Sequence, residues 1–178
     1  MKIANQHIVE LKYTLRKDNA NGEIMEIMDE HWPFKFLFGS GVLIPAFEKY
    51  LEGLEDGATF EFTLSAKEAY GEVDYTITAQ LFRDDIEEDH RYPMENYEEG
   101  DLISVITSSG ERITGKLKAL KAKYILVDTN HAMAGLNLHF EGQVLNVRKA
   151  RTDELIHKRY IEPNGIRSDS RLSEPPNE

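Results

Sequence analysis

The N-terminal part of the chain alternates apolar and polar residues with a period of two. This pattern predicts a strand with one buried face and one face in water. The polar residues between the apolar ones occupy the solvent face. The buried face is expected to carry His7, Val9, Leu11, Tyr13 and Leu15.

A hairpin turn is expected directly after this strand. Asn21 and Gly22 are adjacent, and both residue types tolerate positive φ angles, so the pair predicts a tight two-residue turn. The chain should then return as a second strand from Glu23 to Met28.

The segment from Pro33 to Leu54 combines an apolar strand, a glycine turn and a short helix. Pro45 suits the first position of a helix, and Gly53 suits the position just after its end. Alternation returns between Ala58 and Ala66 and predicts another antiparallel strand. The apolar face of the helix is expected to carry Ile44, Phe47, Leu51 and Leu54.

The pattern changes between Thr76 and Asp128. This block contains an acidic run from Asp84 to His90, a hairpin turned at Ser109-Gly110, and an apolar strand from Tyr124 to Val127. The sheet pattern of the first part resumes only at Leu136–Val147. A strand that returns after such an excursion indicates a host domain interrupted by a guest domain. Loop-closure entropy permits this arrangement, because its cost grows slowly with the length of the insert.

Composition and charge limit the classes of function. The chain has 178 residues and 40% hydrophobic content, enough for a core, and its net charge of -11 opposes binding to nucleic acid or anionic lipid. No apolar run approaches the roughly 20 residues needed to cross a bilayer, and the first residues lack the apolar region of a signal peptide. Without cysteine, disulfides and thiolate chemistry are excluded. We expect a cytoplasmic protein.

Four motifs in order resemble one family. PFKFLFG, GVLIPAFEKYLEGLEDG, AKEAYGEVD and DTNHAMAGLNLHFEGQVLNV look like an FKBP-type peptidyl-prolyl isomerase of the SlyD subfamily, and the similarity covers about residues 2 to 155. The resemblance implies a mainly β (α+β) fold, with an antiparallel sheet wrapped on a short helix and an inserted small β-rich domain. The expected domains are an isomerase domain at 1–75 and 129–155, an insert at 76–128, and a disordered tail at 156–178.

The resemblance also implies which residues form the site. The catalytic set would be Tyr13, Phe34, Tyr70 and Phe140. The substrate-binding set would be Glu26, Leu43, Ile44 and Phe47. Glu26 stands where the family usually has Asp, and Phe47 where the immunophilin members commonly have Trp. Ordinary core positions are assigned to Phe36, Phe60 and Phe62.

Other chemistries find no support in the sequence. There is no glycine-rich phosphate loop and no GxSxG motif, and the six histidines are scattered, so we expect no cofactor and no metal site. The acidic run Asp84–Glu88 lacks the spaced ligands of a calcium loop and is expected to be a solvated face. His131 is expected to have a structural role where the chain leaves the guest domain. The tail after His157 has no histidine, so a nickel-binding cluster is not expected there.

Two functions remain open from the sequence. The first is a peptidyl-prolyl isomerase that acts on unfolded or proline-containing polypeptides, assisted by a holdase activity of the insert. The second is a holdase whose isomerase site is vestigial. In both, the chain is expected to be a monomer without nucleic-acid or membrane partners. The insert residues expected to bind clients are Leu102, Ile103, Val105, Tyr124 and Ile125.

Overall fold

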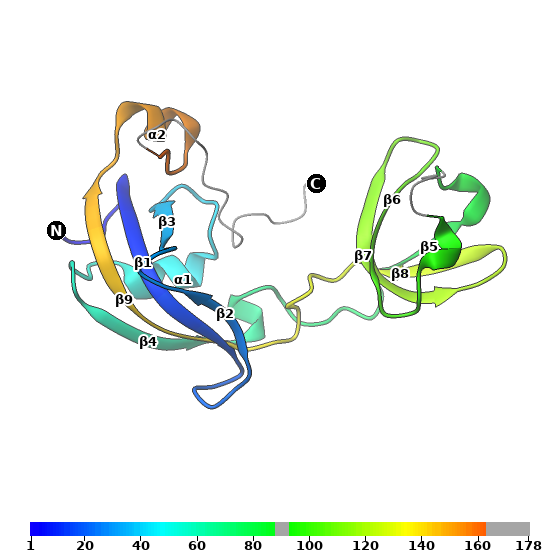
Figure 1. Cartoon of the computed structure of the whole chain (residues 1–178), viewed down its shortest axis with the longest axis horizontal. Helices are drawn as coiled ribbons and strands as arrows, with labels where there is room; N and C mark the ends of the chain where they lie inside the picture. Colours follow the sequence, from blue (N-terminus) through cyan, green and yellow to red (C-terminus); the bar gives the residue numbers. More distant parts are fainter. Residues whose placement is uncertain (88–92, 163–178) are drawn as a thin grey trace. The chain divides into compact units, whose positions relative to one another are not determined.

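The computed structural model describes residues 1–87 and 93–162 (Figure 1). The chain divides into two compact units. Unit 1 is made of residues 1–71 together with the chain from Gly135 onward, and unit 2 is Glu72–Ala134. The limits expected from the sequence, 76 and 128, lie inside unit 2.

Unit 1 is built on a five-stranded antiparallel sheet in which neighbours follow the order β2-β1-β9-β4, with β3 paired to the first half of β1. The longest strand, β9, pairs with both β1 and β4. Two short helices complete the unit. Its elements are β1 His7–Lys17, β2 Ile24–Met28, β3 Phe34–Leu37, α1 Pro45–Leu51, β4 Thr59–Leu64, the 3-10 turn η1 Ala66–Glu68, β9 Leu138–Lys149 and α2 Thr152–His157.

Unit 2 is a four-stranded antiparallel sheet in the order β5-β8-β7-β6. The sequence pattern predicts β6, β7 and β8 but not β5. The core of this sheet consists of Ile103, Val105, Leu117, Ile125 and Val127. Its elements are β5 Thr78–Phe82, the 3-10 turns η2 Arg83–Asp85 and η3 Met94–Asn96, β6 Leu102–Ile106, β7 Arg112–Leu120 and β8 Tyr124–Asp128.

The local predictions for the helix in unit 1 are confirmed. Pro45 is the first residue of α1, and Gly53 has a φ of +80° just after its end. Phe47 and Leu51 are buried on the face that the spacing predicts. The helix therefore begins at a proline, whose fixed φ suits the first helical position. It ends just before a glycine, which adopts positive φ without steric strain.

The first hairpin forms, but its turn is not the predicted one. Positive φ occurs at Asp18 and not at Asn21 or Gly22. The loop is wider because the Asn19 side chain accepts the Asn21 amide at 2.9 Å, and Asn19 carbonyl oxygen accepts the Gly22 amide at 2.8 Å. Glycine is required at position 22 for space, since a Cβ there would lie 1.6 Å from the carbonyl oxygen of Lys17.

The two ends of unit 2 are joined by one side chain. Asn130 Oδ1 accepts the Asp74 amide at 2.9 Å, while Asn130 Nδ2 donates to the Asp74 carbonyl at 2.8 Å and to Asp128 Oδ1 at 2.6 Å. In unit 1, the Gly135 amide donates to the Gly71 carbonyl at 2.8 Å. The points at which the insert leaves and rejoins the host sheet are therefore adjacent, as an insertion of low entropic cost requires.

The C-terminal segment corrects the prediction that the chain is disordered from residue 156. Tyr160 is buried against Ile8 and Leu37 on the sheet, so Ile8 is buried although it lies between the predicted core positions of β1. Glu154 is fully buried and accepts two hydrogen bonds from Arg148, at 2.7 and 2.6 Å. The rest of the predicted tail, residues 163–178, lies outside the described residues.

Loss of the Glu154 carboxylate should release this segment. In Glu154→Ala, Arg148 would keep its charge in a partly buried place without its carboxylate partner, so we expect the free energy of unfolding to fall by about 3 kcal/mol. Urea unfolding followed by far-UV circular dichroism measures the change. The matched control is Asp153→Asn, which alters an exposed pair with Arg151 and should cost less than about 1 kcal/mol. Equal effects of the two variants would contradict the proposed anchoring.

Unit 2 should lose stability in acid through Asp128. Hydrogen bonds from Asn130 and Lys118 lower the pKa of this carboxyl to about 2. Since the folded-state pKa lies below the ordinary value of about 3.9, the stabilisation is complete above that value and is lost as the pH falls from about 4 to 2. Thermal unfolding across this pH range should therefore show a smaller acid-induced loss in Asp128→Asn than in the wild type. Parallel pH curves for the two proteins would refute the assignment.

Candidate active site

Six aromatic side chains of unit 1 form one continuous cluster, which we call the aromatic cluster. Phe47 of α1 lies at its centre, 5.0 Å from Phe140 and 6.4 Å from Phe34 between ring centroids. Tyr13 contacts Phe34 and Phe140 edge-on, at 5.8 and 5.7 Å. The cluster is made of Tyr13, Phe34, Phe36, Phe47, Phe62 and Phe140.

The cluster is packed like a core. Phe140 has no exposed surface, and Phe34 and Phe47 are nearly as buried. Gly142 on β9 provides the space, because a Cβ there would lie 2.7 Å from the Phe60 ring and 2.8 Å from Tyr13 Cβ. The predicted site rings Phe34, Phe47 and Phe140 therefore lie together as a buried apolar base, and any accessible edge of the candidate site must come from other residues.

Three polar groups lie at the edge of the cluster. The Tyr13 hydroxyl donates to Glu26 Oε2 at 3.2 Å. Glu26 can reach this hydroxyl because β2 pairs with β1, with Glu26 opposite Leu15 and Met28 opposite Tyr13. The two β2 side chains therefore lie on the same face of the sheet as Tyr13. The alignment of Glu26 with the usual Asp of the family is thus consistent with the geometry.

The same carboxylate influences both tyrosines. Burial, and after it the negative charge of Glu26, raises the pKa of Tyr13 far above the ordinary value. Burial and then the charge of Glu26 also raise the pKa of Tyr70, which is half-buried. Both phenols therefore stay protonated at working pH and can serve as hydrogen-bond donors.

The turn before α1 contributes the remaining predicted residues. Leu43 is buried and Ile44 is half-buried. Within the described parts of the chain, the backbone amides of residues 40–44 donate no hydrogen bond to backbone or side chain. The turn thus carries donors that are free to bind a carbonyl.

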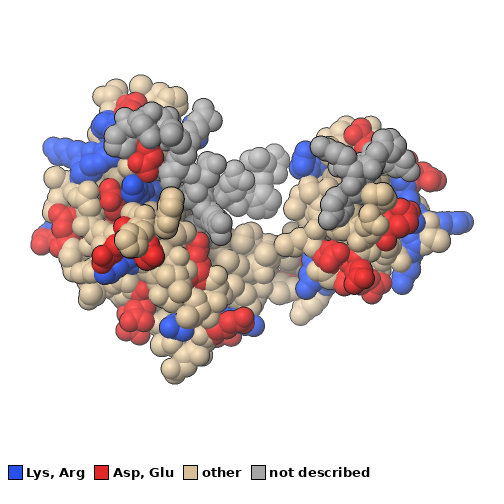
Figure 2. All heavy atoms as spheres, in the orientation of Figure 1, with Lys and Arg blue, Asp and Glu red and all other residues tan. Residues whose placement is uncertain are grey.

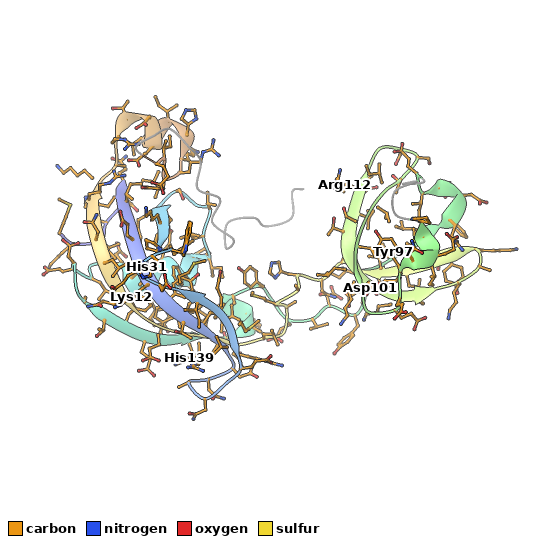
Figure 3. All side chains as sticks on the ribbon, in the orientation of Figure 1. Lys12, His31, Tyr97, Asp101, Arg112 and His139 are labelled. Carbon is orange, nitrogen blue, oxygen red and sulfur yellow. The ribbon has the colours of Figure 1, made fainter. Side chains whose placement is uncertain are left out.

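A polar groove lies on the opposite face of the sheet. His139 on β9, labelled in Figure 3, does not line the groove itself but is buried beside the groove residue Glu61. Its Nδ1 lies 2.9 Å from Thr63 Oγ1 and its Nε2 3.6 Å from Glu61 Oε1. Most of the residues that line the groove alternate with those of the aromatic cluster along the same strands, whereas Tyr13 belongs to both sets. They include Lys12, Thr14, Thr59, Glu61, Glu141 and Gln143. Tyr13 and Phe60 also line the groove, but none of the phenylalanines of the aromatic cluster does, so the aromatic cluster remains the candidate site.

The insert residues predicted to bind clients fall into two groups. Ile103, Val105 and Ile125 are buried in the core of unit 2, so they are corrected to core positions of the folded unit. Leu102 is 71% exposed, and Tyr124 is half-buried. Other exposed apolar side chains of unit 2, which the sequence reasoning missed, are Tyr75, Ile77 and Phe82. Alternation along β6 was the signal that could have separated Leu102 from its buried neighbours.

Charged side chains are spread over the visible surface of each unit (Figure 2). Asp84, Asp85 and Glu87 of the predicted acidic face are exposed, whereas residues 88–90 of that run lie outside the described residues. Across the described residues, no group of three or more His, Asp or Glu side chains is placed to hold a metal ion. Likewise, none of the described helices is long and apolar enough to span a membrane.

Sequence reasoning missed some contacts around the site. Phe36 and Phe62, assigned to ordinary core, touch the same rings as the predicted site residues. Tyr50 stacks on Phe62 at 4.5 Å with an interplanar angle of 7°. Tyr50 lies three residues after Phe47 on the predicted helix, and residues three apart are neighbours on a helix surface. This spacing could have indicated that Tyr50 lies near the aromatic cluster.

Comparison with known proteins agrees with this geometry. The sequence model described as FKBP-type peptidyl-prolyl cis-trans isomerase matches residues 1–118. The FKBP-type peptidyl-prolyl cis-trans isomerase SlyD of Treponema pallidum is 34% identical over 155 residues, which cover 87% of this chain and 84% of that protein. The SlyD proteins of Aeromonas hydrophila and Escherichia coli K12 are both 29% identical over 88% of this chain, covering 70% and 76% of their own lengths.

Proposed function

The chain belongs to the FKBP-type peptidyl-prolyl cis-trans isomerases, and from that premise we propose that it isomerises X-Pro bonds of unfolded or partly folded polypeptides, which unit 2 holds as a chaperone. The observation that carries the proposal is the combination of an apolar aromatic base with two protonated phenols around one carboxylate. Such a site can bind a proline ring and fix the neighbouring carbonyl.

The reaction needs no nucleophile and no base. Rotation about an X-Pro amide is opposed by a barrier of about 18–20 kcal/mol, because rotation breaks the amide resonance. The planar amide is more dipolar than the twisted one. An apolar site therefore destabilises the ground state more than the transition state, and each 1.36 kcal/mol of difference gives about a tenfold gain in rate.

The residues at the edge of the cluster would divide this task. The proline ring would pack at the rim of the aromatic cluster, on the half-buried Ile44 and Tyr70, because Phe140 beneath them has no exposed surface. The Tyr70 hydroxyl, or a free amide of the turn at residues 40–44, would hold the substrate carbonyl while the rest of the peptide pivots. Glu26 would keep the Tyr13 hydroxyl in one orientation through their 3.2 Å hydrogen bond.

Unit 2 supplies the surface for holding clients. Leu102 is strongly exposed at the start of β6, the last strand in the sheet order. Among the described residues, the outer side of β6 is bridged only near its far end, where Ile86 pairs with Thr107 and the Glu87 amide donates to the Ile106 carbonyl. Phe82 ends the other edge strand, β5, and is also exposed. Apolar side chains on open strand edges suit the capture of extended apolar polypeptide. The acidic flanks keep such a surface in solution.

The proposed partners are unfolded, proline-containing polypeptides. Nucleic acid, membranes and a second copy of the chain are not part of the proposal, and the cytoplasmic location stays a prediction. A holdase with a vestigial isomerase site is the alternative, which the peptide assay below separates from the main proposal.

Tyr70→Leu should lower isomerisation of a proline tetrapeptide by about tenfold, because it removes a donor at the edge of an apolar site and leaves the buried base intact. The measurement is the cis/trans exchange rate at several substrate concentrations. Tyr124→Leu, a half-buried tyrosine of unit 2, is the matched control and should leave this rate unchanged. An unaltered rate in Tyr70→Leu would remove Tyr70 from the site, and an inactive wild type would favour the holdase.

Leu102→Ser should separate client holding from catalysis. We expect tetrapeptide isomerisation to stay at the wild-type level, whereas catalysis of a proline-limited refolding reaction falls several-fold, because weaker holding lowers the effective concentration of the client's prolines. Prevention of aggregation should fall in parallel. The control is Ile156→Ser on α2, which has the same 71% exposure but lies in unit 1. Equal effects of both variants on refolding would contradict a specific client surface in unit 2.

A further inference from the structure

Glu48 on α1 is bound to the turn that precedes its own helix. Its Oε1 accepts the backbone amide of Gly39 at 2.9 Å. The side chain is half-buried, and burial raises the pKa of its carboxyl although the Gly39 bond acts in the opposite direction. A carboxylate kept in such a place bears a desolvation cost, which its hydrogen bond must offset.

The turn that Glu48 holds has few other attachments. At its start, Phe38 bonds to the beginning of β1 through the His7 carbonyl and the Gln6 amide. Beyond Gly39, none of the amides up to Ile44 donates a hydrogen bond to any group that the structure describes. The bond to Glu48 is therefore the last hydrogen bond from an amide of this turn before α1 begins.

Two residues of the turn, Gly39 and Gly41, have no side chain that could pack and hold the backbone in place. Gly39 and Gly41 have φ angles of +75° and +77°, which side-chain-bearing residues rarely adopt. A Cβ on Gly39 would lie 2.2 Å from Asn5 Oδ1, so the backbone passes close to the N-terminal segment. Glycine leaves the start of the turn with more conformational freedom than other residues would, and the buried Leu43 side chain fixes only its far end, so the bond to Glu48 restricts the part near Gly39.

We propose that Glu48 is a positioning residue for the isomerase reaction: its carboxylate fixes the Gly39–Ile44 turn so that the free amides and the Leu43 and Ile44 side chains face the substrate in one conformation. The inference rests on the proposed function, in which this turn helps to hold the substrate carbonyl. Glu48 does not touch the substrate in this account and acts only through the turn.

The test compares three substitutions at one position in the full-length chain. Glu48→Gln keeps a carbonyl acceptor of the same length, Glu48→Asp keeps the charge but is one methylene shorter, and Glu48→Ala removes the acceptor. We expect kcat/KM for a proline tetrapeptide to fall about tenfold in Glu48→Ala and Glu48→Asp, mostly through a higher KM, because a mobile turn must be ordered at each binding event. The kcat/KM of Glu48→Gln should lie within about twofold of the wild-type value.

A second readout reports on the turn itself. Amide hydrogen exchange at Gly39 should become faster in Glu48→Ala and Glu48→Asp and stay slow in Glu48→Gln. Glu52→Ala, an exposed carboxylate at the end of the same helix, is the matched control and should change neither exchange nor kinetics. If Glu48→Ala fails to fold, the Asp and Gln variants still decide the question.

Two outcomes would overturn the inference. One is a kcat/KM of Glu48→Asp within about twofold of the wild type, and the other is a Glu48→Gln variant as impaired as Glu48→Asp. Failure of the proposed function would look different, since the wild type itself would then not isomerise the tetrapeptide.

Discussion

The pairing of β9 with both β1 and β4 is the constraint on which the rest of the structure depends. β1 and β4 come from the first part of the chain, whereas β9 begins only after unit 2 has ended. Without β9 the two halves of the host sheet have no common neighbour, and Phe140 is missing from the aromatic cluster. The insert is tolerated because its ends meet at Gly71 and Gly135, so it adds little to the entropy of closing the sheet.

The candidate site uses the same apolar surface that stabilises the host. The buried rings beneath the candidate site are also the rings that pack α1 on the sheet, so the base of the site is closely packed and rigid. The polar groups of the candidate site lie at its rim. There the Tyr13 hydroxyl donates to Glu26, and the charge of Glu26 raises the pKa of Tyr70 further above the ordinary value than burial alone. A reaction that requires only desolvation and a fixed carbonyl suits this division between an inert base and a polar rim.

Periodicity predicted the elements whose burial follows from their own sequence. β1, β4 and the β6–β7 hairpin alternate clearly, and α1 is bounded by Pro45 and Gly53, whereas β9 is buried at three successive residues, Leu138 to Phe140. The resemblance to the isomerase family supplied the set of rings that the structure brings together. Assigning whole strands of the insert to client binding ignored that a small sheet needs half of each strand for its own core, as Ile103 and Ile125 show.

Elements that depend on distant partners were beyond local patterns. α2 has only six residues, and the contact that secures it is the pair of hydrogen bonds that Arg148 on β9 donates to the buried Glu154 carboxylate. β5 is an edge strand whose half-buried pattern lacks clear alternation. In the first hairpin, the Asn19 side chain stabilises a wider loop than Asn21-Gly22 would give alone. Each case was decided by a hydrogen bond or packing partner that the residue spacing does not reveal.

The position of β9 in the chain also sets an order of events during synthesis. A ribosome delivers the complete unit 2 before it delivers the strand that closes the host sheet. Domains generally fold as units, in the order in which they are made. The newborn chain therefore holds a finished guest domain while its own aromatic base is still incomplete, and for that interval its unpaired β1 and β4 edges resemble the unfolded polypeptides that the mature protein is proposed to serve.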